Sequence, residues 1–257
     1  MRPLLTLHFV RHGETTANRE GIIQGHKDYD LTPLGFNQAV ATADRLRGNS
    51  YWQAYSSDLT RARRTAEVIL EEHAEVTLHK TQLLREFALG AQEGLPRGTT
   101  WWVSKAFRIK AEQAGVVPED YVECLRESPA DVKQRAQQFL DVLIEDALRA
   151  EAGTMEEGRG EGGGETTAPD AEHGEDGNPR LVLVVSHGGI LNVMMLAVMR
   201  LKRAEIMDNG AVAVVDVYGR QGWVRYAPRT LNDSSHVDQA GRSKACYAEN
   251  FGKSVAK

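Results

Sequence analysis

The sequence Leu4-Leu5-Thr6-Leu7-His8-Phe9-Val10-Arg11-His12-Gly13-Glu14-Thr15 opens with a short apolar run that ends at a basic pair. Such a run predicts a buried strand over Leu4–Val10. A second run, Leu181–Val185, ends similarly in Ser186-His187-Gly188-Gly189. Histidine followed by glycine at the end of each buried strand is typical of an α/β sheet, because such sheets bind ligands beyond the carboxyl ends of their strands.

The remaining chain alternates between helix and strand patterns. Apolar residues at helical spacing predict four helices: after Thr32-Pro33, over Leu59–Leu70, after Ser128-Pro129, and over Ile190–Met199. Further strands are predicted at Ala54–Ser56, Val76–Leu78, Ala211–Val217 and Trp223–Tyr226. Strands that alternate with helices favour an α/β fold with three αβα layers and a mostly parallel central sheet.

Composition excludes several classes of protein. The chain has 257 residues, of which 41% are hydrophobic and 26% charged, as in an ordinary globular domain. No stretch approaches the 18 apolar residues of a membrane-spanning helix. Two cysteines, Cys124 and Cys246, are too few for a disulfide framework or a cysteine-rich metal site. We therefore expect a protein of a reducing compartment, and the predicted location is the cytoplasm.

Charge is unevenly distributed along the chain. Residues 151–179 hold nine acidic residues and one basic residue, so the rest of the chain carries +3 although the whole carries −5. Rich in glycine and poor in large apolar residues, this segment is predicted to be a disordered acidic insertion within a single domain of residues 1–231. Residues 232–257 are predicted to be a polar tail. A mildly basic body suits a small anionic ligand and predicts binding to neither nucleic acid nor membranes.

Five motifs in order resemble those of the histidine phosphatase (phosphoglycerate mutase-like) superfamily. The first is Arg11-His12-Gly13-Glu14-Thr15-x-x-Asn18, and Ser186-His187-Gly188-Gly189 closes the set. The three between them are Gln24-Gly25 with Asp30-Leu31-Thr32-Pro33-Leu34-Gly35-x-x-Gln38-Ala39, then Ser57-Asp58-Leu59-x-Arg61-Ala62-x-x-Thr65-Ala66, and Leu84-Arg85-Glu86 with Gly90 and Glu93-Gly94. The resemblance implies a phosphoglycerate mutase-like fold and spans residues 4 to about 217.

The resemblance also implies a role for each matching residue. His12 would be the nucleophile that forms a phosphohistidine, and Glu86 the general acid and then base. Arg11, Arg61 and His187 would hold the phosphoryl group, whose charge lies on three oxygens that need convergent donors. Asn18 would add a neutral donor. The remaining residues expected at the substrate are Gln24, Gly25, Gly188 and Asn209, although a plain turn is an alternative for Asn209. No metal or other cofactor is implied.

Within the superfamily, the sequence favours a phosphatase over a mutase. Mutases usually place a tyrosine shortly after the acid and an arginine pair further on, whereas Glu86 is followed by Phe87-Ala88 and residues 95–120 contain no such pair. The segment Glu127-Ser128-x-x-x-Val132-x-x-Arg135 resembles one in cofactor-independent phosphatases. The position of the insertion resembles the TIGAR-like branch, which is associated with fructose-2,6-bisphosphate hydrolysis. Residues 95–115, with Trp101 and Trp102, would either cap the site or form an amphipathic helix that packs its aromatic residues on the domain.

Three functions therefore stand open. The favoured one is a metal-independent phosphatase that hydrolyses a small phosphorylated metabolite, with a sugar bisphosphate as the candidate substrate. The alternatives are a phosphoglycerate mutase and a non-catalytic interaction protein on the same fold. The expected oligomeric state is a monomer or homodimer.

Overall fold

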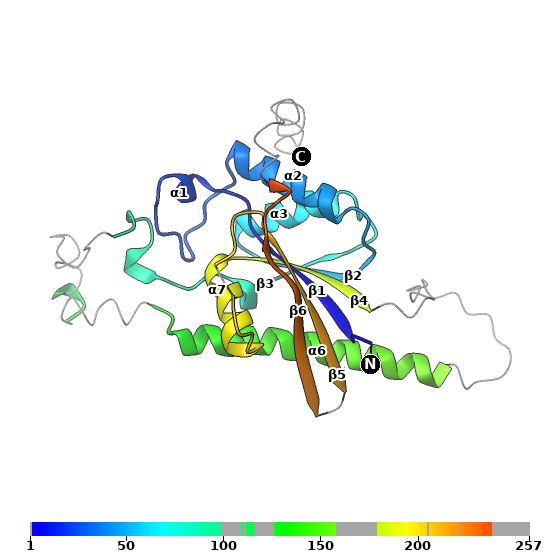
Figure 1. Ribbon diagram of the computed structural model, residues 1–257. Helices are drawn as coiled ribbons and strands as arrows, with labels where there is room; N and C mark the ends of the chain where they lie inside the picture. The colour runs from blue at the N-terminus through cyan, green and yellow to red at the C-terminus, as the bar shows by residue number, and fades with distance from the viewer. Residues whose placement is uncertain are drawn as a thin grey trace.

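A single six-stranded sheet organises the chain (Figure 1). The computed structural model describes residues 2–98, 109, 112–115, 126–157, 179–204, 206–220 and 222–237. The strands are β1 (Leu5–Arg11), β2 (Tyr51–Ser57), β3 (Leu78–Thr81), β4 (Arg180–Ser186), β5 (Val212–Arg220) and β6 (Trp223–Asp233), in the order β3-β2-β4-β1-β5-β6. Strands β3, β2, β4 and β1 run parallel, and β5 and β6 pair antiparallel at one edge. This mixed sheet, parallel in its centre, confirms the predicted architecture.

Helices cover both faces of the sheet and make it three-layered (Figure 1). Helices α2 (Pro33–Leu46) and α3 (Thr60–Leu70) lie on one face, and α6 (Pro129–Glu157) and α7 (Gly188–Val193) on the other. A π-helical turn (Met194–Val198) continues α7. The shorter elements are α1 (Thr16–Arg19) and the 3-10 turns Gln82–Leu84 and Gly90–Gln92.

The core follows from the alternation of side chains along β1. Leu5, Leu7 and Phe9 are fully buried against the α6 and α7 layer, whereas Val10 packs with the α2 and α3 layer. Successive residues of a strand point to opposite faces, so one central strand contributes to both halves of the core. Strand β4 is used in the same way, with Val182 in one cluster and Leu183 in the other.

Two helix starts match the signals in the sequence. The Thr32 side chain accepts a hydrogen bond from the Gly35 backbone N–H, and Pro33 is the first residue of α2. Ser128 accepts one from the Asp131 backbone N–H at the start of α6. Proline fits the first helical turn because its missing N–H would have no partner there. These caps fix where the two longest helices leave the loops that carry site residues.

Several element boundaries differ from those predicted, among them those of β3, α6 and β6. Strand β3 covers Leu78–Thr81 rather than Val76–Leu78, because Val76 packs on the core just before the strand begins. Helix α6 continues to Glu157, into the range assigned to the insertion, where Ala, Met and Glu are good helix formers. Strand β6 extends to Asp233, past the predicted end of the domain, and the Arg45–Asp233 ion pair at 2.7 Å ties it to α2.

Several sequence-based predictions concern residues that the structure does not describe. Trp101 and Trp102 of the predicted cap lie outside the described residues, as do residues 158–178 of the insertion, residues 238–257 of the tail and both cysteines. Among the residues that the structure describes, no helix has the length and apolar character needed to cross a membrane.

Candidate active site

The two strand-end histidines lie side by side at the carboxyl edge of the sheet. Arg11 of β1 is in register with Ser186 of β4, so the residues that follow them leave the sheet together. The His12 backbone N–H donates to the Ser186 carbonyl at 3.0 Å. The centroids of the His12 and His187 rings are 5.1 Å apart. The parallel pairing of β1 with β4 therefore builds the centre of the site that the two motifs predicted.

The hydrogen bond made by His12 fixes its tautomer. Its Nδ1 lies 2.7 Å from the Gly13 carbonyl oxygen, which can only accept a hydrogen bond. Nδ1 therefore carries the proton, and Nε2 keeps its lone pair. Burial lowers the pKa of His12 well below the usual histidine value, and the charges of Arg61 and Arg11 lower it further. The imidazole is neutral at physiological pH, with the form that a nucleophile needs.

His187 is held in the opposite tautomer. Arg61 donates from Nε to His187 Nδ1 at 3.1 Å, and because a guanidinium has no acceptor, Nδ1 must be unprotonated. Burial, followed by the charge of Arg61, lowers the pKa of His187 well below the usual value, so the ring is neutral with its proton on Nε2. That Nε2 is buried and has no hydrogen-bond partner among the described residues. It is a donor left free for a ligand.

Arg61 places a positive charge beside His187 and within electrostatic reach of His12. It lies on α3 with only 1% of its surface exposed, and it donates to the Gly25 carbonyl at 2.8 Å and the Lys27 carbonyl at 3.1 Å. Burial lowers the pKa of Arg61 to about 10, so it is charged at neutral pH. Its three hydrogen-bond partners are neutral groups. A buried cation fixed by neutral groups favours an anionic ligand, since buried charges need compensation.

Arg11 adds a second cation. Its Nη1 donates to the Met207 carbonyl, while Nε is buried without a partner in the described part of the chain. Burial lowers the pKa of Arg11, and the charge of Glu86 opposes that shift. Gly188 lies against the guanidinium, because a Cβ built there would be 3.4 Å from Arg11 Cζ and 2.9 Å from Ile206 Cγ2. Glycine therefore gives Arg11 room at the start of α7.

The carboxylate of Glu86 reaches the same helix terminus. Glu86 follows the 3-10 turn after β3, and its side chain accepts hydrogen bonds from Gly189 N at 3.0 Å and Ile190 N at 3.2 Å. Its charge raises the pKa of both Arg11 and Arg61, in opposition to burial. Glu86 thus lies within electrostatic reach of both cations.

The predicted amide residues hold the loop around His12. Asn209 donates from Nδ2 to the His12 carbonyl at 2.9 Å and approaches Asn18 Oδ1 at 3.4 Å. Asn18 Oδ1 accepts from the Thr15 backbone N–H, and Gln24 Oε1 accepts from the Thr15 hydroxyl. Asn209 also forms the turn that the sequence suggested. The three amides form a polar chain linked to the backbone of the nucleophile.

Comparison with known proteins identifies the class of this site. A family model described as "Histidine phosphatase superfamily (branch 1)" matches residues 7–152, more than half of the chain. The chain belongs to the histidine phosphatase superfamily. The enzyme class of the chain is a phosphoric monoester hydrolase.

Several relatives of this histidine phosphatase carry phosphatase names, and others carry phosphoglycerate mutase names. It is 32% identical over 209 residues to the mouse protein "Fructose-2,6-bisphosphatase TIGAR", covering 74% of this chain and 75% of that one. It is 30% identical over 234 residues to the Arabidopsis thaliana "Metal-independent phosphoserine phosphatase", covering 90% and 83%. A mycobacterial glucosyl-3-phosphoglycerate phosphatase, solved with VO3, superimposes with a TM-score of 0.62 at 26% identity, covering 88% and 98%.

Several supporting residues of this histidine phosphatase were not singled out from the sequence. Thr65 accepts a hydrogen bond from the Gly13 backbone N–H at 3.1 Å, and Gln38 accepts from Glu14 N at 2.8 Å. Glu93 Oε1 accepts from the His26 backbone N–H at 2.8 Å. All three stand in the motifs that carry the resemblance, which was the available signal. Their task is to bind backbone N–H groups of the site loops rather than ligand.

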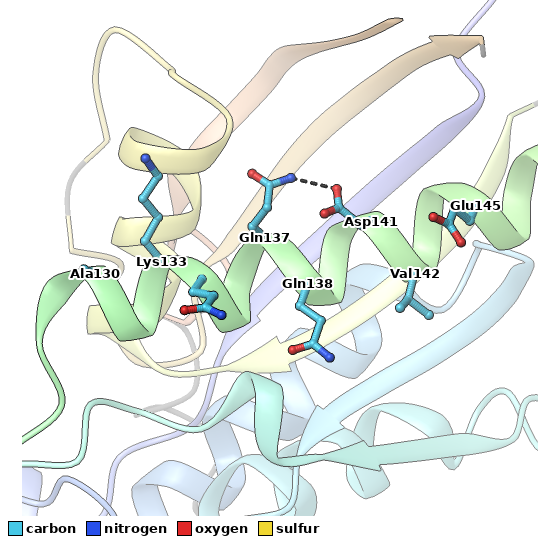
Figure 2. A pocket seen from close by; sticks show the side chains of 8 residues that line it. Ala130, Lys133, Gln137, Gln138, Asp141, Val142 and Glu145 are labelled. Atoms are coloured by element: carbon cyan, nitrogen blue, oxygen red, sulfur yellow. Dashed lines mark hydrogen bonds between the residues drawn. The ribbon is translucent and has the colours of Figure 1, made fainter. Parts of the chain in front are cut away.

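A groove outside the site of the histidine phosphatase runs along the outward face of α6 (Figure 2). Gln137 and Asp141 line it and hydrogen-bond to each other at 2.7 Å, and Lys133 and Glu145 line it further along the helix. None of the candidate catalytic residues lines it. Within the described part of the chain, no group of three or more histidine, cysteine, aspartate or glutamate residues is placed to hold a metal ion.

Proposed function

We propose that this histidine phosphatase hydrolyses a small phosphomonoester through a phosphohistidine on Nε2 of His12. In the first step, the Nε2 lone pair attacks phosphorus, the ester P–O bond breaks, and Glu86 gives its proton to the leaving oxygen. In the second step, Glu86 takes a proton from water, the water oxygen attacks phosphorus, and the P–N bond breaks. Phosphate leaves, and His12 and Glu86 return to their starting forms.

The opposite tautomers of the two histidines carry the proposal. Gly13 leaves a lone pair on His12 Nε2, and Arg61 leaves a proton on His187 Nε2. One ring is thereby suited to attack phosphorus and the other to donate to a phosphoryl oxygen. A site with two donors or two bases would need the same tautomer in both rings. A nucleophile beside a donor to the oxyanion needs opposite tautomers, as His12 and His187 have.

The cations support a phosphoryl ligand. Arg11 Nε and His187 Nε2 are both buried without a partner among the described residues. Buried donors without partners are costly in a native structure, so an absent ligand is their simplest complement. A phosphoryl group in transfer carries charge on three oxygens, which Arg11, Arg61 and His187 would neutralise.

A sugar bisphosphate is the proposed substrate. The mouse relative is named for fructose-2,6-bisphosphate, and the chain covers three quarters of it. The absence of a tyrosine and an arginine pair after Glu86 supports hydrolysis over mutase activity. The mildly basic composition of the chain outside residues 151–179 fits a ligand with two phosphates.

Phosphate release from a panel of metabolites tests the proposal. The panel contains fructose-2,6-bisphosphate, fructose-1,6-bisphosphate, phosphoserine, 3-phosphoglycerate and a nitrophenyl ester, assayed in EDTA. We expect turnover of a sugar bisphosphate that is lost in His12→Ala, and an acid-labile, alkali-stable phosphoprotein in quenched wild-type reactions. Activity of His12→Ala above a tenth of wild type would contradict the nucleophile assignment. A requirement for a divalent ion would contradict the mechanism.

Two further readouts separate the alternatives. Interconversion of 2- and 3-phosphoglycerate without phosphate release would identify a mutase. A folded protein that is silent on the whole panel, and that forms no phosphohistidine with any member, would favour a binding role.

A further inference from the structure

Two charged residues outside the site bind the backbone of the segment that carries Glu86. Arg135 of α6 donates from Nη1 to the carbonyls of Leu83, at 3.0 Å, and Arg85, and from Nη2 to the carbonyl of Glu86 at 2.9 Å. Glu127 accepts from the Ala88 backbone N–H at 2.8 Å. Backbone groups on both sides of Glu86 are therefore bound by side chains from one neighbouring segment.

The two residues are themselves joined by a bidentate ion pair. Arg135 Nε donates to Glu127 Oε1 at 2.7 Å, and Arg135 Nη2 to Oε2 at 2.9 Å. Planar pairs of this kind fix geometry as well as charge. We call Glu127 and Arg135 the clamp. It engages three carbonyls and one N–H group of the segment while leaving the Glu86 side chain free to reach α7.

The clamp is partly shielded from water. The exposed fraction of the side chain is 12% for Arg135 and 22% for Glu127. Burial opposes ionisation of Glu127, but the hydrogen bonds from Arg135 and from Ala88 N lower its pKa below the usual value. The pair is thus charged at neutral pH and stronger than an exposed salt bridge, which contributes little.

Glu86 is consequently fixed at both of its ends. The clamp and His26, whose Nε2 lies 2.8 Å from the Glu86 carbonyl, hold its backbone. Gly189 N and Ile190 N hold its carboxylate. The carboxylate bonds alone leave the backbone free to slide, because a glutamate side chain has three rotatable bonds. A displacement of about 1 Å in a catalytic group lowers the rate about a hundredfold.

We propose that Arg135 and Glu127 are positioning residues that set Glu86 for proton transfer to the leaving oxygen. The inference rests on the proposed function, in which Glu86 is the general acid. Neither residue of the clamp touches the reacting atoms in this scheme. Their loss should therefore resemble a weakened form of the loss of Glu86. A merely structural role would instead lower stability and slow all substrates alike.

The test compares substrates that need a proton donor with one that does not. Steady-state kcat/KM, which reports only on the steps up to cleavage of the ester P–O bond, is measured for an alkyl phosphomonoester and for nitrophenyl phosphate, whose leaving group departs without protonation. Arg135→Met keeps the side-chain volume and removes the charge, and Glu127→Gln keeps the shape. For both, we expect kcat/KM for the alkyl ester to fall about tenfold more than kcat/KM for the nitrophenyl ester.

Arg149→Met is the matched control. Arg149 also lies on α6 and also pairs with carboxylates, Glu145 and Asp146, but its side chain is 73% exposed and its ion pairs within the described residues stay on α6. This variant should match wild type on both esters. Arg135→Lys restores the charge without the planar fork, so it should recover only part of the alkyl-ester activity. Thermal melting checks that each variant is folded, and Glu127→Gln keeps the test open if Arg135→Met does not fold.

A double-mutant cycle separates failure of this inference from failure of the proposed function. If Glu86 is the acid, Glu86→Gln alone shows the leaving-group dependence, and adding Arg135→Met costs little more. Equal losses on both esters in Glu86→Gln would overturn the acid role itself. A leaving-group effect in Glu86→Gln, with none in folded Arg135→Met or Glu127→Gln, would overturn only the positioning role. Full additivity of the two changes would overturn it as well.

Discussion

Arg61 donates its Nε–H to Nδ1 of His187, and this single hydrogen bond determines what His187 offers to a ligand. The proton of a neutral imidazole must then sit on Nε2, which is buried and has no partner in the described part of the chain. His12, 5.1 Å away, is set the other way by the carbonyl of its neighbour Gly13. In both histidines the hydrogen bond made by Nδ1 thus decides whether Nε2 carries a lone pair or a proton.

The two tautomers can be observed directly. In the ligand-free protein at pH 6, both rings should be neutral because burial lowers the pKa of each. Nitrogen-15 NMR should find His12 protonated on Nδ1 and His187 on Nε2, assigned with His12→Ala and His187→Ala. Detection of an imidazolium at either position at pH 6, or of the same tautomer in both rings, would contradict the scheme.

Replacement of Arg61 by lysine should disable the site although the charge remains. A lysine has a single terminal nitrogen, which cannot serve the Gly25 carbonyl, the Lys27 carbonyl and His187 with the same geometry. We expect kcat/KM for nitrophenyl phosphate to fall by about 10²-fold or more. Arg63→Lys is the control, because Arg63 lies on the same helix and pairs only with Glu67 in the hydrogen bonds described. Equal activity of the two variants would show that Arg61 is dispensable.

Gly189→Ala should displace Glu86 without unfolding the protein. A Cβ at this position would lie 2.4 Å from Glu86 Oε1, which is the movable end of a flexible side chain. We expect turnover of alkyl phosphomonoesters to fall about tenfold or more, with a smaller effect on nitrophenyl phosphate. Gly48→Ala, where nothing lies within 4 Å of the added carbon, serves as control. Unchanged alkyl-ester activity in a folded Gly189→Ala protein would show that Glu86 can act from another position.

His8 should make the fold sensitive to acid. Its Nδ1 lies 2.9 Å from the Tyr51 hydroxyl, and burial, followed by the charges of Arg229 and Arg45, lowers its pKa to about 4. The unfolded chain binds a proton near pH 6.5 and the folded chain only near pH 4. The free energy of unfolding therefore falls as the pH drops through that window, by at most about 3 kcal/mol from this group.

Urea unfolding at pH 7.5 and pH 4.5 measures the contribution of His8. His8→Asn keeps a polar group near Tyr51 but cannot take up a proton. The difference in stability between the two pH values should be about 2 to 3 kcal/mol smaller in this variant than in wild type. Other buried histidines contribute equally to both proteins, so they cancel. An identical pH dependence in the two proteins would show that His8 is not the group responsible.

The sequence predicted the elements whose signals are local. The Thr32-Pro33 cap, the apolar stripe of α6 and the buried β1 and β4 strands all appear where their patterns placed them. The edge strands were harder. Strand β3 contains the exposed His79 and Lys80, and β6 contains Pro228, so neither shows the apolar pattern of a buried strand. Strand β3 forms by pairing with β2, and β6 by pairing with β5. A strand's pairing partner cannot be inferred from its own short sequence.

For the site, the sequence indicated which residues to expect but not how they are connected. His12, Arg61, His187 and Glu86 were expected together, and the structure brings them to one edge of the sheet. The tautomer of His187 depends on Arg61, which lies 126 positions away, although that of His12 is set by its neighbour Gly13. The grip of Arg135 on the Glu86 segment likewise spans 49 positions. Such long-range contacts follow from strand order and helix placement, which motif spacing does not contain.

Helix α6 and strand β4 each have one end near the candidate active site and one end far from it. The chemistry lies where β4 ends, at His187, whereas the chain enters β4 at Arg180, at the opposite end of a strand about 20 Å long. Helix α6 likewise begins beside the Glu86 segment and ends far from it (Figure 1). The connection between the C-terminal end of α6 and the N-terminal end of β4 can be lengthened or changed in sequence without changing the register of the catalytic strands. A tag or an added domain could therefore be inserted between the C-terminal end of α6 and the N-terminal end of β4, away from the catalytic residues.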